Sequence, residues 1–73
     1  MMQILAYEAD TDRWNVYCGN EYFCSIHCGD CFKLRVEDHY LPVRMEMDCE
    51  WYVVLDTYKI VLSPRRKYAI LMP

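Results

Sequence analysis

The stretch from Cys31 to Met72, CFKLRVEDHYLPVRMEMDCEWYVVLDTYKIVLSPRRKYAILM, decides the fold. Apolar residues occupy every second position in five successive segments of this stretch, and short polar breaks separate the segments. Such alternation is typical of antiparallel strands that bury one face. The sequence therefore predicts an all-β fold in which this region forms a meander.

The polar breaks of the meander mark its expected hairpin loops. We predict two-residue loops at Asp38-His39 and Thr57-Tyr58, and a three-residue loop at residues 48–50. In an antiparallel pair, core-facing residues must lie opposite core-facing residues, and a slip of one residue would turn the core face outward. The predicted pairs on the core face include Val36–Leu41, Met47–Trp51 and Leu55–Ile60.

The rest of the chain continues the β pattern. Residues 3–9 and 13–18 read as a hairpin, residues 22–26 as a short strand, and residues 67–72 as the last strand. Residues 1–73 are expected to form a single small domain. A short sheet that buries one face must curl, so we expect a small SH3-like barrel or a strongly curled antiparallel meander with an N-terminal hairpin.

Composition and charge bear on location and partners. The net charge of -3 gives no overall attraction to nucleic acid or to an anionic membrane. The N-terminal apolar run stops at Glu8 and follows no basic segment, so we expect neither a signal peptide nor a membrane span. A cytoplasmic location follows from this expectation, and there the five cysteines would remain thiols.

Several short motifs resemble those of a known family. They are Tyr7 with Asp12-Arg13-Trp14, His27-Cys28-Gly29-Asp30, Pro42-x-Arg44-x-Glu46, Trp51-Tyr52 and Tyr68-x-Ile70. Together they resemble a family of short bacterial proteins that is catalogued only as a domain of unknown function, with HCGD, P-x-R-x-E and WY elements. The resemblance covers nearly the whole chain and implies a small β domain. It implies no catalytic residue.

The cysteine spacing raises the possibility of a metal site. Cys24, Cys28 and Cys31 are candidate zinc ligands, because a Cys-x2-Cys loop that contains glycine can turn two thiolates toward one ion. The alternative is that small reduced cysteines fill a tight core. A thioredoxin-like redox role is less favoured, because no helix is predicted after the motif.

The sequence does not predict an enzyme. His27 and Cys28 are adjacent, and adjacent side chains on an extended chain point apart, so they make a poor catalytic pair. Cross-strand ion pairs account for the carboxylates on the strands. The chain has only two glycines and no glycine-rich phosphate loop. We therefore expect no catalytic residue and, apart from the zinc alternative, no cofactor.

Aromatic and basic residues offer two binding surfaces. Tyr40, Tyr52 and Tyr58 are expected at loops or on the outward face, where they would form a surface like the one with which SH3-type modules bind extended peptides. Arg65-Arg66-Lys67 could contact phosphates, as small basic barrels do. The acidic balance of the chain makes nucleic acid the less favoured partner.

The last strand is apolar on both faces. We expect Tyr68, Ile70 and Met72 to face the core, and Leu71 to point outward near Val54 and Val61 of neighbouring strands. The N-terminal hairpin or a second copy of the chain would cover this apolar patch, and we favour the second copy because a short chain gains stability by associating.

These observations favour one reading of function over two alternatives. The favoured reading is a non-catalytic protein-interaction module that engages a protein or itself. A small zinc-binding protein and a weak nucleic-acid-binding barrel are the alternatives.

Overall fold

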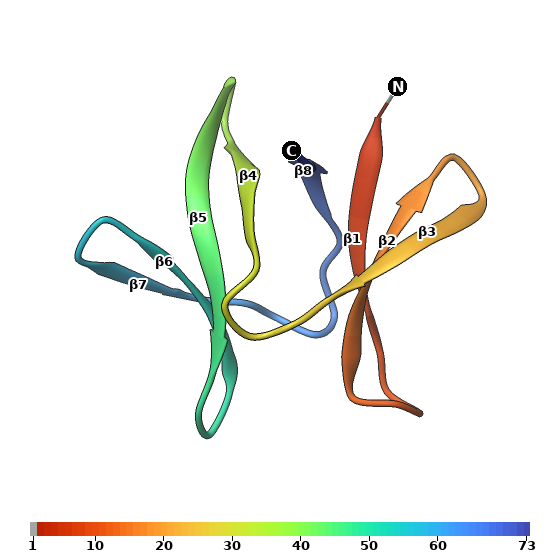
Figure 1. Ribbon diagram of the computed structural model, residues 1–73, viewed down its shortest axis with the longest axis horizontal. Coiled ribbons are helices and arrows are strands. Elements are labelled where there is room, and N and C mark those ends of the chain that lie inside the picture. Colours follow the sequence, from red (N-terminus) through yellow and green to blue (C-terminus); the bar gives the residue numbers. More distant parts are fainter. Residues whose placement is uncertain (1) are drawn as a thin grey trace.

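The computed structural model describes residues 2–73, and it contains strands and no helix in that range (Figure 1). Eight strands follow one another along the chain. They are β1 (Gln3–Glu8), β2 (Arg13–Cys18), β3 (Glu21–Ile26), β4 (Cys31–Val36), β5 (His39–Met47), β6 (Trp51–Leu55), β7 (Tyr58–Val61) and β8 (Tyr68–Leu71). The predicted all-β class is confirmed.

All eight strands belong to one antiparallel sheet with the order β3-β2-β1-β8-β4-β5-β6-β7. Strand β8 lies between β1 and β4, so the end of the chain joins two meanders, β1–β3 and β4–β7 (Figure 1). In the described range no further strand pairs with the outer edge of β3 or of β7. The sheet is therefore an open, strongly curled meander, and of the two predicted forms it is the closed barrel that is absent.

The hairpin registers were predicted correctly in one case and shifted in two. Met47 lies opposite Trp51, as expected. Val36, however, lies opposite His39, and Leu55 lies opposite Tyr58, so the loops are at residues 37–38 and 56–57. Both shifts are of two residues. A shift of two keeps every side chain on its face, so the alternation alone could not detect it.

The core occupies the concave side of the sheet. Its buried residues come from every strand except β7, and β7 adds the partly buried Ile60. Trp14 is its largest fully buried side chain, and its ring lies 5.4 Å from that of Tyr7 and 5.9 Å from that of Tyr68, measured between centroids. The other buried apolar residues are Leu5, Val16, Ile26, Phe32, Leu34, Val43, Met45, Val53, Leu62 and Ile70. Burial of this one face is what curls the sheet.

A single carboxylate forms a side-chain tie between the two meanders. Asp12, in the β1–β2 turn, accepts a hydrogen bond of 2.6 Å from the Tyr7 hydroxyl and one of 3.0 Å from Trp51 Nε1. Trp51 begins β6, in the other meander. The tie therefore holds the curl across a gap that no strand pairing bridges.

The last strand faces the core as predicted but has different neighbours. Ile70 is fully buried, and Tyr68 and Met72 pack against the core. Ala69 lies opposite Ile4 of β1, and Leu71 lies opposite Lys33 of β4. The expectation that Leu71 lies near Val54 and Val61 is wrong, because those residues belong to β6 and β7 at the far edge of the sheet.

Candidate interaction surface

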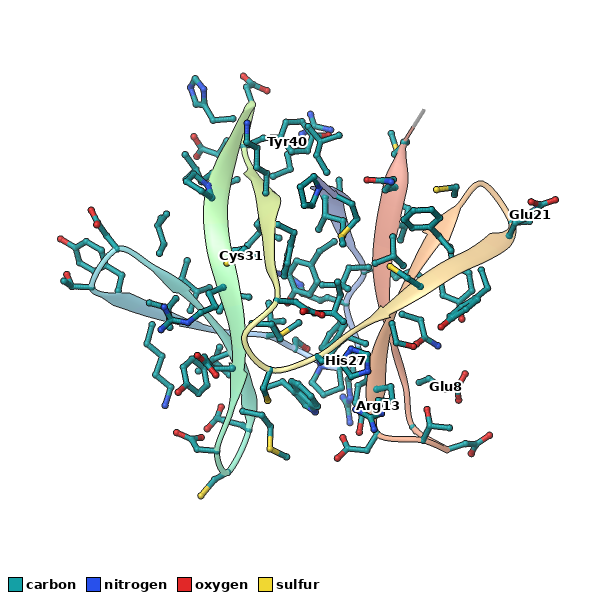
Figure 2. All side chains as sticks on the ribbon, in the orientation of Figure 1. Glu8, Arg13, Glu21, His27, Cys31 and Tyr40 are labelled. Atoms are coloured by element: carbon teal, nitrogen blue, oxygen red, sulfur yellow. The ribbon has the colours of Figure 1, made fainter. Side chains whose placement is uncertain are left out.

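The three candidate zinc ligands lie in different surroundings. Cys24 is half-buried and packs against the core from β3. Cys28 is exposed in the β3–β4 connection, and Cys31 is exposed at the start of β4 (Figure 2). Within residues 2–73, no three His, Cys, Asp or Glu side chains are close enough together to hold a metal ion. The structure therefore does not gather Cys24, Cys28 and Cys31 into one site.

The thiol of Cys24 is suited to a core position. Burial raises its pKa, and the nearby carboxylate of Asp30 and the thiol of Cys18 raise it further. A raised pKa keeps the thiol protonated, and the thiolate is the form that binds metal and attacks electrophiles. The reading of Cys24 as a small core residue fits these surroundings.

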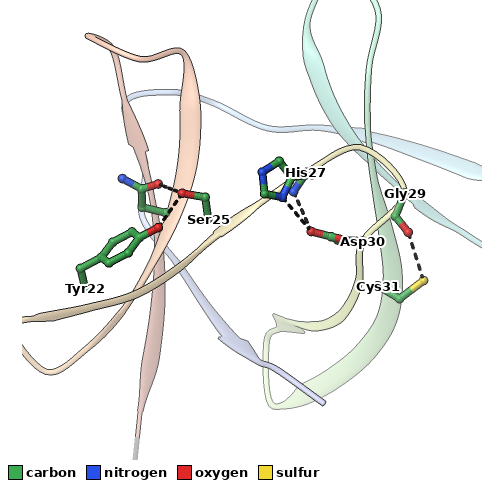
Figure 3. Close-up of polar contacts among 7 residues, drawn as sticks. Tyr22, Ser25, His27, Gly29, Asp30 and Cys31 are labelled. Carbon is green, nitrogen blue, oxygen red and sulfur yellow. Dashed lines mark hydrogen bonds and ion pairs between the residues drawn. The ribbon is translucent and has the colours of Figure 1, made fainter.

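The His27-Cys28-Gly29-Asp30 motif forms a turn that is anchored to β5. Asp30 Oδ2 accepts a hydrogen bond of 2.7 Å from the His27 backbone N–H (Figure 3). The Asp30 N–H in turn donates to the His27 carbonyl. Gly29 has a φ of 92°, a conformation that glycine adopts at little cost. Its N–H donates to the Met45 carbonyl, and the Met45 N–H donates to the Asp30 carbonyl. The motif thus fastens the crossover between the meanders.

The β2–β3 hairpin carries a short series of side-chain hydrogen bonds on its surface. Ser25 donates a hydrogen bond of 2.7 Å to Asn15 Oδ1, which leaves the Tyr22 hydroxyl to donate to Ser25 Oγ at 2.9 Å (Figure 3). The ring of Tyr22 packs edge-on against Tyr17. An extra residue, Phe23, interrupts the pairing of the edge strand β3 and is exposed. Such a bulge discourages another chain from adding to the edge.

The predicted aromatic surface is divided between two places. Tyr52 and Tyr58 lie on the β6–β7 ribbon, where Lys59 Nζ is 4.4 Å from the centroid of the Tyr52 ring and Tyr58 is exposed at the end. Tyr40 lies near the start of β5 (Figure 2), and Leu71 lies on β8. The four residues therefore do not form one continuous patch.

A groove of about 390 Å³ lies on the outer face of the sheet where β4, β5 and β8 meet. Leu71, Lys33 and Pro42 are consecutive cross-strand neighbours on this face. The residues that line the groove are Cys31, Phe32, Lys33, Pro42, Leu71, Met72 and Pro73. Most of its wall is apolar, and Lys33 is the one charged residue among them.

A second hollow, of about 440 Å³, lies on the same face over β1 and β2. Ile4, Ala6, Tyr17 and Lys67 are among the residues that line it. Ile4 is opposite Ala69, and Ala69 shares the outer face of β8 with Leu71, so the two hollows lie on one continuous outer face. Its lining is more polar than that of the groove.

Of the basic run Arg65-Arg66-Lys67, which precedes β8, only one residue lines a hollow. Lys67 lies beside Tyr17 in the second hollow, whereas Arg65 and Arg66 line neither hollow. The corner is held by backbone and hydroxyl contacts: the Arg66 N–H donates to the Ser63 carbonyl, and the Ser63 N–H donates to the Tyr68 hydroxyl. A turn that exposes the basic side chains accounts for this arrangement.

Comparison with known proteins places the chain in a family. A family model described as "Domain of unknown function (DUF5348)" matches residues 3–70. The chain belongs to this family. No curated protein matches the chain.

A solved structure supports the same fold. A crystal structure of a protein from Ruminococcus gnavus, a structural genomics target, superposes with a TM-score of 0.73 at 29% sequence identity. The match covers 99% of the present chain and 100% of the other. The eight-stranded arrangement of this member of DUF5348 is thus similar to that of a crystallised protein.

The structure also contains features that sequence reasoning missed. The groove was missed because β8 was expected beside β7, and only its placement between β1 and β4 brings Leu71 to Lys33 and Pro42. The tie at Asp12 joins residues 39 positions apart, and no local pattern connects them. No helix in the described part of the chain is long and apolar enough to cross a membrane.

Proposed function

We propose that this DUF5348 protein is a non-catalytic interaction module that binds another protein through the outer face of its sheet. The observation that carries the proposal is the apolar groove at Leu71 and Pro42, which lies on exposed sheet surface. The side chain of Leu71 is 39% exposed. Apolar hollows with few polar groups are the usual places where proteins receive side chains of a partner.

The carboxylates that have hydrogen-bond partners support a non-catalytic role, because each of them stabilises a turn or a contact between strands. Asp12 accepts a hydrogen bond from Tyr7 as part of the tie between the meanders, and Asp30 accepts one that holds the β3–β4 connection. Asp48 accepts hydrogen bonds from the backbone N–H groups of the β5–β6 loop and from Lys59. The separate positions of Cys24, Cys28 and Cys31 support a module without zinc, and five thiols fit a cytoplasmic location.

The short motifs are best explained as features that hold the family fold. The HCGD turn is anchored to Met45, and Trp51 of the WY pair donates to Asp12. In the P-x-R-x-E strand, Arg44 Nε is 2.7 Å from Glu46 Oε2. We infer that the family uses these motifs for architecture and binds through surface residues outside them.

The test compares two surface variants of equal chemistry. Leu71→Glu places a charge in the groove, and Val61→Glu places one on exposed β7, outside the groove. Both variants should keep the far-UV spectrum of the wild type. We expect affinity capture from the native host to recover proteins with the wild type and with Val61→Glu but not with Leu71→Glu.

Self-association is measured in the same experiment by sedimentation. A dimer that Leu71→Glu dissociates and Val61→Glu leaves intact would identify a second copy as the partner of the groove. Capture that both variants retain, in a wild type that sediments as a monomer, would contradict the proposal.

A further inference from the structure

The charges of the chain are sorted by position, although its net charge is acidic. Eight of the eleven carboxylates lie in loops between strands. Five of the eight cations lie on strands, and Lys33, Arg35 and Arg44 lie together on the outer face of β4 and β5. Glu46 pairs with Arg44, and no other carboxylate lies on a strand of this part of the outer face. The outer face of β4 and β5 beside the groove therefore carries three cations and one carboxylate.

Lys33 is the charge best placed to contact a groove-bound molecule. It lies between Leu71 and Pro42 in the row that crosses β8, β4 and β5. Within residues 2–73 no carboxylate forms an ion pair with it, whereas Arg44 pairs with Glu46 and Arg35 Nε donates to the Glu37 carbonyl. An apolar hollow beside an ammonium group selects an apolar side chain that is followed by an anion.

The strands beneath the groove limit how a partner can bind. Strands β8, β4 and β5 are interior strands, and each is paired on both sides. Lys33 and Leu34 of β4 pair with β8 on one side and with β5 on the other, so a partner that lies over them is held by side chains and not by strand addition. Seven lining residues are far fewer than the roughly 20–30 on each side of a standard protein interface. The groove therefore fits a short extended segment.

We propose that the groove binds an extended peptide segment in which aliphatic side chains alternate with or adjoin carboxylates. The inference rests on the proposed function and names the chemistry of its partner. The aliphatic side chain packs against Leu71 and Pro42 in the groove, and a carboxylate pairs with Lys33.

Two other occupants fit the groove less well. In a symmetric dimer the same surface lies on both sides, so Lys33 and its neighbouring cations would face those of the second copy. A single-stranded nucleic acid requires exposed aromatic rings for stacking, and Phe32, the one aromatic residue among those that line the groove, is 3% exposed and packs in the core.

The experiment titrates defined probes into the full chain and follows backbone amide shifts by NMR. The probes are a short capped peptide of leucines flanked by glutamates, the same peptide with lysines for glutamates, the same peptide with serines for leucines, and an oligothymidylate. Lys33→Glu tests the contact. Arg66→Glu is the matched control, because it changes the net charge equally at an exposed residue outside the groove.

We expect the leucine–glutamate peptide to shift the amides of Lys33 and Leu71, and Lys33→Glu to lower its affinity about tenfold, as for loss of one charged hydrogen bond. Arg66→Glu should change the affinity less than about threefold, since distant exposed charges are screened. Equal binding of the lysine peptide or of the serine peptide would overturn the inference.

Two results would separate this inference from the proposed function. If capture from the host depends on Leu71 but no acidic peptide binds, the partner chemistry is wrong and the interaction module stands. If only the oligothymidylate binds, and Arg66→Glu weakens it, both the peptide and the protein partner are wrong.

Discussion

At the scale of single residues, a few carboxylates do most of the positioning. Asp12 accepts hydrogen bonds from Tyr7 and Trp51, and these hydrogen bonds hold the pKa of its carboxyl below the ordinary value. The same contact raises the pKa of the Tyr7 hydroxyl. The sequence shows these residues as separate motifs, and their convergence follows only from the three-dimensional curl.

The lowered pKa of Asp12 predicts an acid-sensitive contribution to stability. The ionised carboxylate is the form that the folded protein favours, so its contribution is present above the ordinary pKa near 4 and is lost as the pH falls through the folded value. Asp12→Asn should lower the urea midpoint at pH near 7, and the difference from the wild type should shrink near pH 3. Asp38→Asn, in a different loop, is the control. A difference that is equal at both pH values would contradict the role of the charge.

The positive backbone angles of the turns lead to a second prediction at this scale. Glu37 has a φ of 57°, a left-handed conformation that costs a non-glycine residue about 1 kcal/mol or more. Glu37→Gly should therefore raise the free energy of unfolding by up to about 1 kcal/mol, whereas Asp38→Gly, one residue further in the same loop, should lower it. Thermal unfolding of both variants measures the difference, and stabilisation by Asp38→Gly would refute the argument.

At the scale of elements, the alternation of apolar residues predicts which face of each strand is buried. Phe32, Leu34, Val43 and Met45 face the core as that pattern requires. Alternation repeats every two residues, so it leaves the register open by multiples of two, and the turn residue with positive φ settles it. The neighbours of β8 could not be predicted, because the order of strands in a sheet is not recorded in any local period.

Strand β8 should be the most sensitive element, because it joins the two meanders. Ile70→Ala removes a fully buried side chain from its centre and should cost about 2–5 kcal/mol. Val61→Ala, at an exposed position of the edge strand β7, should cost less than about 0.5 kcal/mol. Chemical denaturation of both variants provides the comparison, and similar losses would contradict the expected sensitivity of β8.

At the scale of the whole molecule, the sheet separates two kinds of surface. The concave face is a closed apolar core, and the outer face carries cations beside an apolar groove. The net charge of -3 predicts little attraction to anions, and it conceals this sorting because most carboxylates lie in the hairpin loops. The composition therefore gives the net charge of the chain but does not reveal the cations that gather around Lys33.

The topology also predicts slow folding for so short a chain. Gln3 pairs with Ile70, so the sheet is complete only when segments from opposite ends of the described range meet. Proteins dominated by such distant pairings fold in milliseconds to seconds. Stopped-flow refolding followed by tryptophan fluorescence should show a phase in this range, and folding that is complete within microseconds would contradict the expectation.

The position of β8 has a consequence for synthesis on the ribosome. Until residue 71 has left the exit tunnel, β1 and β4 each have one unpaired edge and the core lacks Ile70. Exposed strand edges and apolar surface are where nascent chains associate wrongly. The growing polypeptide thus carries two half-sheets that stay separate until β8 pairs with both, and we expect it to bind chaperones most strongly before β8 has emerged.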